Sequence, residues 1–176
     1  MCRNLDSARM VFVCLALLAT HSDIAADDEY PDSTVRAGSS PSETLSAYFT
    51  TLEQQNQSPD LDIYTPATQR MLREWVTTAA QMNNLLSTYR RCHAEKARID
   101  SRQRYAVIRY PVDERQCSPW FFEFVDGAWA MDLTMMQRAI RFGRDNAWRF
   151  DRGADHPYDF AFADWAFDSN GFPRER

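Results

Sequence analysis

The fold is decided by the stretch Trp120-Phe121-Phe122-Glu123-Phe124-Val125-Asp126-Gly127-Ala128-Trp129-Ala130-Met131-Asp132-Leu133. Asp126-Gly127 separates two runs that are rich in aromatic and other strand-forming residues. This pair is the strongest short-range hairpin signal, because Asp and Gly accept the positive φ that two-residue hairpin turns require. The stretch therefore predicts a β-hairpin with strands over residues 119–125 and 128–134.

The two-residue turn also determines which residues face each other. Val125 is expected to pair with Ala128, and the pairing continues down to Trp120 opposite Leu133. Because side chains alternate along a strand, one face is predicted to be wholly apolar, with Trp120, Phe122, Phe124, Trp129, Met131 and Leu133. The opposite face holds Glu123 and Asp132 beside Phe121 and Val125. A sheet with one apolar face must pack that face on another layer.

Two amphipathic helices before the hairpin are the expected cover for that face. Ser40-Pro41-Ser42-Glu43 combines an N-cap, a helix-starting proline and a capping box, and the apolar period continues toward Asn56. A second helix is expected to start at Thr65-Pro66 and to run through Leu86 or beyond. Further elements are expected over residues 89–99 (strand), 104–112 (strand) and 135–142 (short helix or turn). This order predicts an α+β domain with an antiparallel sheet packed on N-terminal helices.

The two ends of the chain have distinct compositions. Residues 1–26 combine a positive start, an apolar run and a small-residue cleavage site, which is the pattern of a secretory signal peptide. The apolar run is too short for a membrane span, which needs about twenty residues. Residues 27–40 are polar and predict a flexible lead-in. Residues 143–176 are rich in aromatic and aspartate residues, and we expect this tail to pack on the domain formed by residues 41–142.

The cysteines and the overall charge agree with export. Cys92 and Cys117 are the two cysteines that remain once the signal peptide is removed, and in an oxidising compartment they predict one disulfide. Nearly all basic residues are arginine, a bias that suggests a GC-rich bacterial genome. The sequence thus predicts a periplasmic or secreted bacterial protein. A formal net charge of −5 argues against binding to nucleic acid or to an anionic membrane.

Three segments carry a resemblance to a known superfamily. They are Pro41-Ser42-Glu43-Thr44-Leu45-Ser46-Ala47-Tyr48-Phe49, Ile63-Tyr64-Thr65-Pro66-Ala67-Thr68 and the hairpin over residues 120–133. In element order and apolar pattern, residues 41–134 resemble the nuclear-transport-factor-2-like (SnoaL-like, cystatin-like) superfamily. The resemblance implies a cone-like curved sheet with helices in its mouth and a pocket inside. The aromatic tail departs from the usual ending of this family, and it would either plug the pocket or cover the outer face of the sheet.

The pocket that this resemblance implies would be lined by aromatic side chains. The candidate ligand-binding residues are Tyr48, Tyr64, Trp75, Tyr110, Phe122 and Trp129. Enzymes of the superfamily use buried carboxylates and tyrosines, and the remaining candidates here are Asp60 and Asp62 with Tyr48 or Tyr110. No cofactor and no metal site is predicted, because the remaining soft ligands lack zinc-site spacing; these are Cys92, His93, Cys117 and His156.

Two segments of opposite charge allow two interpretations. Residues 90–109 hold seven basic and two acidic residues, whereas residues 145–168 hold six aspartates and two arginines. The segments either neutralise each other across the fold, or the basic one forms a surface for an anion or an acidic partner. The candidate residues of such a surface are Arg90, Arg91, Arg98, Arg102 and Arg104.

Together these features favour a non-enzymatic exported binding module that recognises a partner protein or a small apolar ligand. A homodimer through the sheet is a further expectation. Two alternatives remain open. One is a small isomerase- or hydrolase-like enzyme that uses the cone pocket, and the other is a periplasmic inhibitor or immunity protein.

Overall fold

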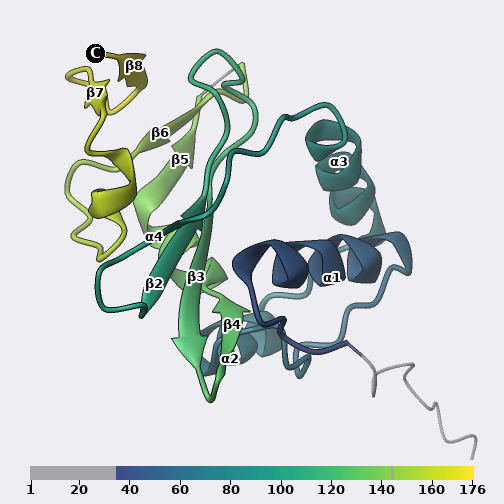
Figure 1. Cartoon of the computed structure of the whole chain (residues 1–176). Helices are drawn as coiled ribbons and strands as arrows, with labels where there is room; N and C mark the ends of the chain where they lie inside the picture. Colours follow the sequence, from purple (N-terminus) through teal and green to yellow (C-terminus); the bar gives the residue numbers. More distant parts are fainter. Residues whose placement is uncertain (1–34, 144) are drawn as a thin grey trace, which may run out of the picture.

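The computed structural model describes residues 35–143 and 145–176, and it confirms an α+β fold with an antiparallel sheet (Figure 1). The predicted signal peptide and residues 27–34 of the predicted lead-in lie outside the described residues. Within the described ranges, no helix combines the length and the apolar character that crossing a bilayer requires.

A four-stranded antiparallel sheet in the order β1-β2-β3-β4 forms the centre of the fold. Its strands are β1 (Arg98–Ile99), β2 (Tyr105–Ile108), β3 (Trp120–Val125) and β4 (Ala128–Met131). β3 and β4 form the predicted hairpin, with Val125 opposite Ala128 and Phe122 opposite Met131. Asp126 and Gly127 have φ values of 50° and 87°, so both turn residues take the positive φ that suits this pair to the turn.

The hairpin is shorter than the sequence predicted. β4 ends at Met131, and the Asp132 carboxylate caps a new helix, α4 (Leu133–Ala139), by accepting a hydrogen bond from the Met135 backbone N–H at 3.0 Å. Leu133 is therefore the first residue of a helix and does not pair with Trp120. The apolar face is also not wholly buried, because Phe124 lies beside the turn and is 43 % exposed.

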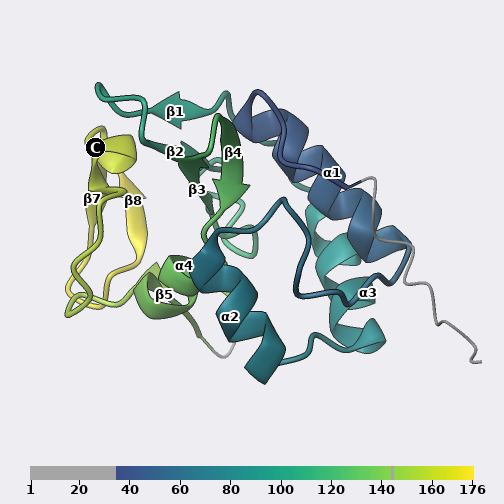
Figure 2. The ribbon, with the colours of Figure 1, turned by 90° about the horizontal axis from the view of Figure 1, so that it is seen from below.

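Helices cover the apolar face of the sheet. α1 (Pro41–Glu53) begins with the predicted capping box, in which the Glu43 backbone N–H donates to Ser40 Oγ and the Ser40 backbone N–H donates to the Glu43 carboxylate. α1 and α3 (Ala79–Tyr89) lie side by side on this face (Figures 1 and 2). Phe122 and Trp129 are buried beneath this helical layer, as the hairpin register predicted.

The segment from residue 66 to residue 99 differs most from the sequence prediction. α2 (Pro66–Glu74) ends early, and α3 starts anew after Thr78, which forms a second capping box with Gln81. The strand expected over residues 89–99 is limited to β1. The reason is that Met82, Leu86 and Tyr89 lie on one helical face and carry α3 into the core.

The C-terminal part of the chain covers the other face of the sheet (Figure 2). Its elements are β5 (Ile140–Phe142), β6 (Trp148–Phe150), the 3-10 helix η1 (Asp159–Phe162), β7 (Trp165–Phe167) and β8 (Pro173–Glu175). This layer forms a second core with Val107 and Phe121, and Tyr158 stacks on Phe121 with 4.2 Å between ring centroids. Each face of the sheet thus packs on residues of the described chain itself.

Asp132 lies on the tail side of the sheet, as the register predicted. That side of the sheet is not exposed to solvent, however, because the tail covers it. The Tyr158 hydroxyl donates to Asp132 Oδ2 at 2.9 Å, so one carboxylate joins the hairpin, α4 and the tail. A buried carboxylate with two hydrogen-bond donors is a satisfied structural group.

One buried arginine fastens the tail to the sheet. Arg109 directly follows β2, and its side chain is 3 % exposed. Its guanidinium donates to both oxygens of the Asp164 carboxylate at 2.7 Å and to Glu95 at 2.7 Å. It also donates to the Ala161 carbonyl at 2.8 Å and lies over the Trp165 ring. The hydrogen bonds from Arg109 lower the pKa of Asp164.

His156 is a buried histidine of the tail, and its Nε2 lies 3.4 Å from Asp159 Oδ1. Its ring lies among Phe121 and Phe150, and Nδ1 has no hydrogen-bond partner in the described chain. Burial lowers the pKa of His156, although the charges of Asp155 and Asp159 oppose this effect.

Because the folded-state pKa of His156 is depressed, the unfolded chain binds a proton first. Stability is therefore full above the unfolded pKa of about 6.5 and falls as the pH drops through the lower folded value. We expect His156→Phe to reduce the loss of unfolding free energy between about pH 6.5 and 5. Urea unfolding at several pH values measures this loss, and an unchanged loss in the variant would show that other groups cause it.

Candidate functional site

A cleft of about 880 Å³ opens between α3 and α4. Residues from α3 form one wall, and residues from α4 and β5 form the other. The loop before β3 contributes Gln116 and Ser118, and Trp120 at the start of β3 adds to the lining. A volume of this size is within the range of small-molecule sites in proteins.

The inner part of the cleft is aromatic, and its rings are held by ring contacts and hydrogen bonds. Trp120 packs against Tyr89 with 4.7 Å between ring centroids and against Tyr48 with 5.4 Å. The Tyr89 hydroxyl contacts the Ser118 carbonyl at 2.9 Å and Ser118 Oγ at 2.8 Å, while Trp120 Nε1 donates to the Tyr110 hydroxyl at 2.9 Å. Burial raises the pKa of both Tyr48 and Tyr89, so both hydroxyls stay protonated at neutral pH.

Two aromatic side chains stand exposed at the rim of the cleft. Trp75 caps the C-terminal end of α2 and is 55 % exposed, and Phe142 ends β5 and is 56 % exposed. Both side chains also line the cleft, so their apolar surface borders it directly. The rim thus offers two rings to a ligand that enters the cleft.

The remaining lining is aliphatic or carries neutral polar groups. The aliphatic residues are Leu85, Leu133, Met136 and Ile140, and the hydroxyl residues are Ser87, Thr88 and Ser118. The amide residues are Gln81, Asn84, Gln116, Gln137 and Asn146. Every residue that lines the cleft is therefore neutral at pH 7, and the polar groups are those that orient a ligand by hydrogen bonds.

Comparisons with protein-family models, with curated proteins and with solved structures gave no match. The class of ligand that suits the cleft is therefore inferred from the lining residues alone. Aromatic rings, aliphatic side chains, amides and hydroxyls together suit binding of a neutral, largely apolar molecule.

The structure brings two of the six predicted ligand-binding residues to this cleft. Tyr48 and Trp75 line it. The other four are buried in the first core, between the sheet and the helices, and do not line it; they are Tyr64, Tyr110, Phe122 and Trp129. Of these, Tyr110 acts indirectly, because its hydroxyl fixes the orientation of Trp120.

The carboxylates considered for catalysis lie elsewhere. Asp60 forms a surface ion pair with Arg73, and Asp62 is exposed in the loop before α2. Neither lines the cleft, although Tyr48, one of their proposed partners, does.

The basic stretch is partly neutralised by the tail. Arg98 pairs with Asp164 at 2.8 Å, and the same carboxylate binds Arg109. Arg104 pairs with Glu123 at 3.3 Å, and Arg90 pairs with Glu53 at 3.1 Å. Arg91 lines a second, smaller pocket that also contains acidic residues, and Arg102 is exposed. The basic and acidic segments thus neutralise each other where Arg98 and Arg109 both pair with Asp164.

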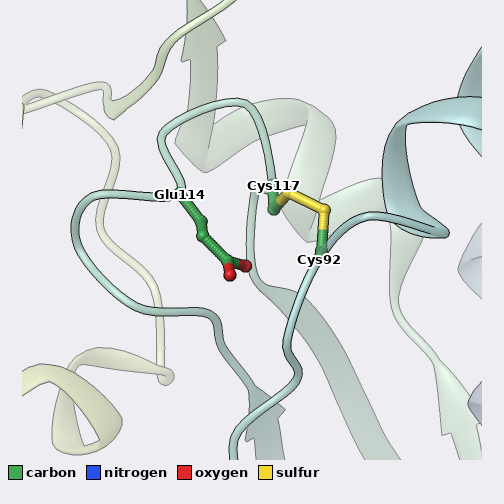
Figure 3. Close-up of side chains that lie close together, drawn as sticks. All are labelled: Cys92, Glu114 and Cys117. Carbon is green, nitrogen blue, oxygen red and sulfur yellow. A yellow bond between two sulfur atoms is a disulfide. The ribbon is translucent and has the colours of Figure 1, made fainter.

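The predicted disulfide between Cys92 and Cys117 is confirmed (Figure 3). It joins the end of α3 to the loop before β3, and both segments line the cleft through Tyr89 and Ser118. The cross-link therefore holds two walls of the cleft together. A loop of 25 residues closed by one disulfide adds stability of about 3 kcal/mol.

The sequence predicted a short helix or turn over residues 135–142, but it predicted neither the start of α4 at Leu133 nor that α4 and β5 form a wall of the cleft. Leu133, Met136 and Ile140 are spaced by three and four residues, which is a helical period, but the first of them was assigned to a strand. The signal that could have found this wall is Asp132, an N-cap residue directly before that period.

Proposed function

We propose that this chain is an exported, non-enzymatic binding module whose cleft takes a small, neutral and largely apolar ligand. The observation that carries the proposal is the lining of the cleft, which joins buried aromatic rings to a rim of two exposed rings and neutral amides. Ligand sites of this kind gain affinity from apolar burial and gain orientation from a few polar groups. General acid–base chemistry instead uses a carboxylate, an imidazole or a similar group within reach of the substrate.

The proposal extends to the family and the compartment. A cone-like nuclear-transport-factor-2-like fold is supported by the antiparallel sheet with α1 and α3 on one face. Export is supported by the composition of residues 1–26 and by the disulfide between Cys92 and Cys117. A small ligand is favoured over a partner protein because the exposed rings at Trp75 and Phe142 border a cleft.

Binding of Nile red, a neutral apolar dye, tests the proposal. We expect saturable fluorescence enhancement with one site per chain. Trp75→Ala should weaken dye binding about tenfold, because one lost ring contact of roughly 1.4 kcal/mol corresponds to that factor. Stability should change little, since Trp75 is 55 % exposed.

The neighbouring Val76 provides a matched control. It is 54 % exposed but does not line the cleft, so Val76→Ala should bind the dye as the unmodified chain does. Equal affinities for both variants would show that the dye binds elsewhere and would count against the cleft.

A further inference from the structure

A second cluster of reactive side chains lies outside the cleft. Figure 3 shows the Glu114 carboxylate pointing toward the sulfur atoms of Cys92 and Cys117. One ligand-type atom from each of the three residues lies within 4.8 Å of the others. Cys117 is buried, and Cys92 and Glu114 are half-buried, so the cluster is partly shielded from solvent.

We propose that Cys92, Cys117 and Glu114 bind a zinc ion when the disulfide is reduced. A dithiol reductant gives two electrons to the disulfide and becomes a disulfide itself, which leaves two cysteine thiols. Zinc then displaces the two thiol protons and bonds to both sulfur atoms and to one carboxylate oxygen. This site is independent of the ligand proposed for the cleft.

The donor set and its local geometry suit zinc. Thiolate and carboxylate are both zinc ligands, and three protein ligands leave the fourth tetrahedral position to water or another donor. Glu114 and Cys117 lie on one turn, in which the Cys117 backbone N–H donates to the Glu114 carbonyl at 2.9 Å. Zinc sites commonly place two ligands on such a turn with two residues between them, which is the spacing of Glu114 and Cys117.

His93 positions the carboxylate. Its backbone N–H donates to Glu114 Oε2 at 2.8 Å, and its Nδ1 lies 2.5 Å from Glu114 Oε1. Hydrogen bonds of this kind orient a metal ligand from outside the coordination shell. Arg91 and Arg115 line the pocket beside the cluster, where their charges offset the negative charge left by two thiolates and one carboxylate on a divalent ion.

Cobalt(II) titration of the full chain tests this site, because cobalt reports its own ligands. The chain is reduced with a dithiol, freed of the reductant without oxygen, and titrated with cobalt(II) alone. We expect one equivalent to bind with the strong thiolate-to-cobalt charge-transfer absorption of two sulfur ligands, and we expect zinc to displace it. The oxidised chain should show no such absorption.

Single substitutions test Glu114 as a metal ligand and His93 as the residue that positions it. Glu114→Gln and His93→Gln should each weaken metal binding about tenfold or more, while His93→Gln keeps the absorption of two thiolates. Asp113→Asn is the control, since Asp113 lines the same pocket outside the cluster and its variant should bind as the unmodified chain does.

Two results would overturn the proposal: no charge-transfer absorption in the reduced chain, or unchanged affinity in Glu114→Gln. If reduction of the disulfide unfolds the chain, circular dichroism measures whether added metal restores the folded state. Refolding upon metal addition supports the site, and a chain that stays unfolded with excess metal contradicts it.

Discussion

Replacing Arg109 by methionine is expected to lower the free energy of unfolding by about 3 kcal/mol. Arg109 is buried and donates to Asp164, Glu95 and the Ala161 carbonyl. The variant leaves these acceptors without their shared donor and removes the cation from the Trp165 ring. Because Asp164 and Ala161 belong to the tail, the tail should become the first segment that a protease cleaves.

Arg104 is the control for this effect. It lies in the same basic stretch, but its ion pair with Glu123 is exposed to solvent, and exposed pairs contribute little to the free energy of unfolding. Urea unfolding of Arg104→Ala and Arg109→Met compares the two. Equal stabilities would show that the tail does not depend on the buried guanidinium.

The second large effect is expected for Gly171→Ala, with a loss of about 3 kcal/mol. Gly171 has a φ of +86° in the turn between β7 and β8, and its carbonyl accepts a hydrogen bond from the Phe150 backbone N–H at 2.9 Å. A methyl group there would clash with the Phe150 carbonyl oxygen, so the turn would have to move away from β6. The cost of positive φ and the loss of the hydrogen bond to Phe150 therefore both lower the free energy of unfolding.

Gly127→Ala separates these two causes. Gly127 has nearly the same φ, +87°, but the space around its Cβ position is open. Its variant should lose about 1 kcal/mol, the cost of positive φ alone. Thermal unfolding of the two variants measures the difference, and similar losses would mean that Gly171 does not join the turn to β6.

The hairpin was the part of the fold that the sequence predicted best. Its turn residues have a local conformational requirement, and its apolar alternation is compatible with one register only. Val125 therefore lies opposite Ala128 as expected, with Phe122 and Trp129 on the buried side. The helix start at Ser40 was equally local and equally correct, because a capping box depends on four adjacent residues.

The predicted element boundaries were wrong where two local signals in the sequence competed. The helical period from residue 66 continues through Trp75, so the second capping box at Thr78 was overlooked and two helices were joined into one. Residues 90–97 contain no element because the disulfide and the turn after Tyr89 direct the chain there. No period in the sequence predicts this path.

The candidate site was harder to predict than the fold. Aromatic composition pointed to Tyr48 and Trp75, but also to Tyr64 and Phe122, which pack inside the core. Which aromatic residues face a cleft depends on how α3 and α4 are placed across the sheet. That placement follows from tertiary packing between segments far apart in the chain, and a single sequence does not reveal it.

The cleft between α3 and α4 is the proposed ligand site. Nuclear magnetic resonance of methyl-labelled protein with bound Nile red tests it most directly, because Leu85, Met136 and Ile140 bring methyl groups into the cleft. Intermolecular nuclear Overhauser effects from the dye to these three methyl-bearing residues are the expected result. Contacts confined to the exposed residues Ile99 of β1 and Phe124 of β3, neither of which lines the cleft, would contradict it.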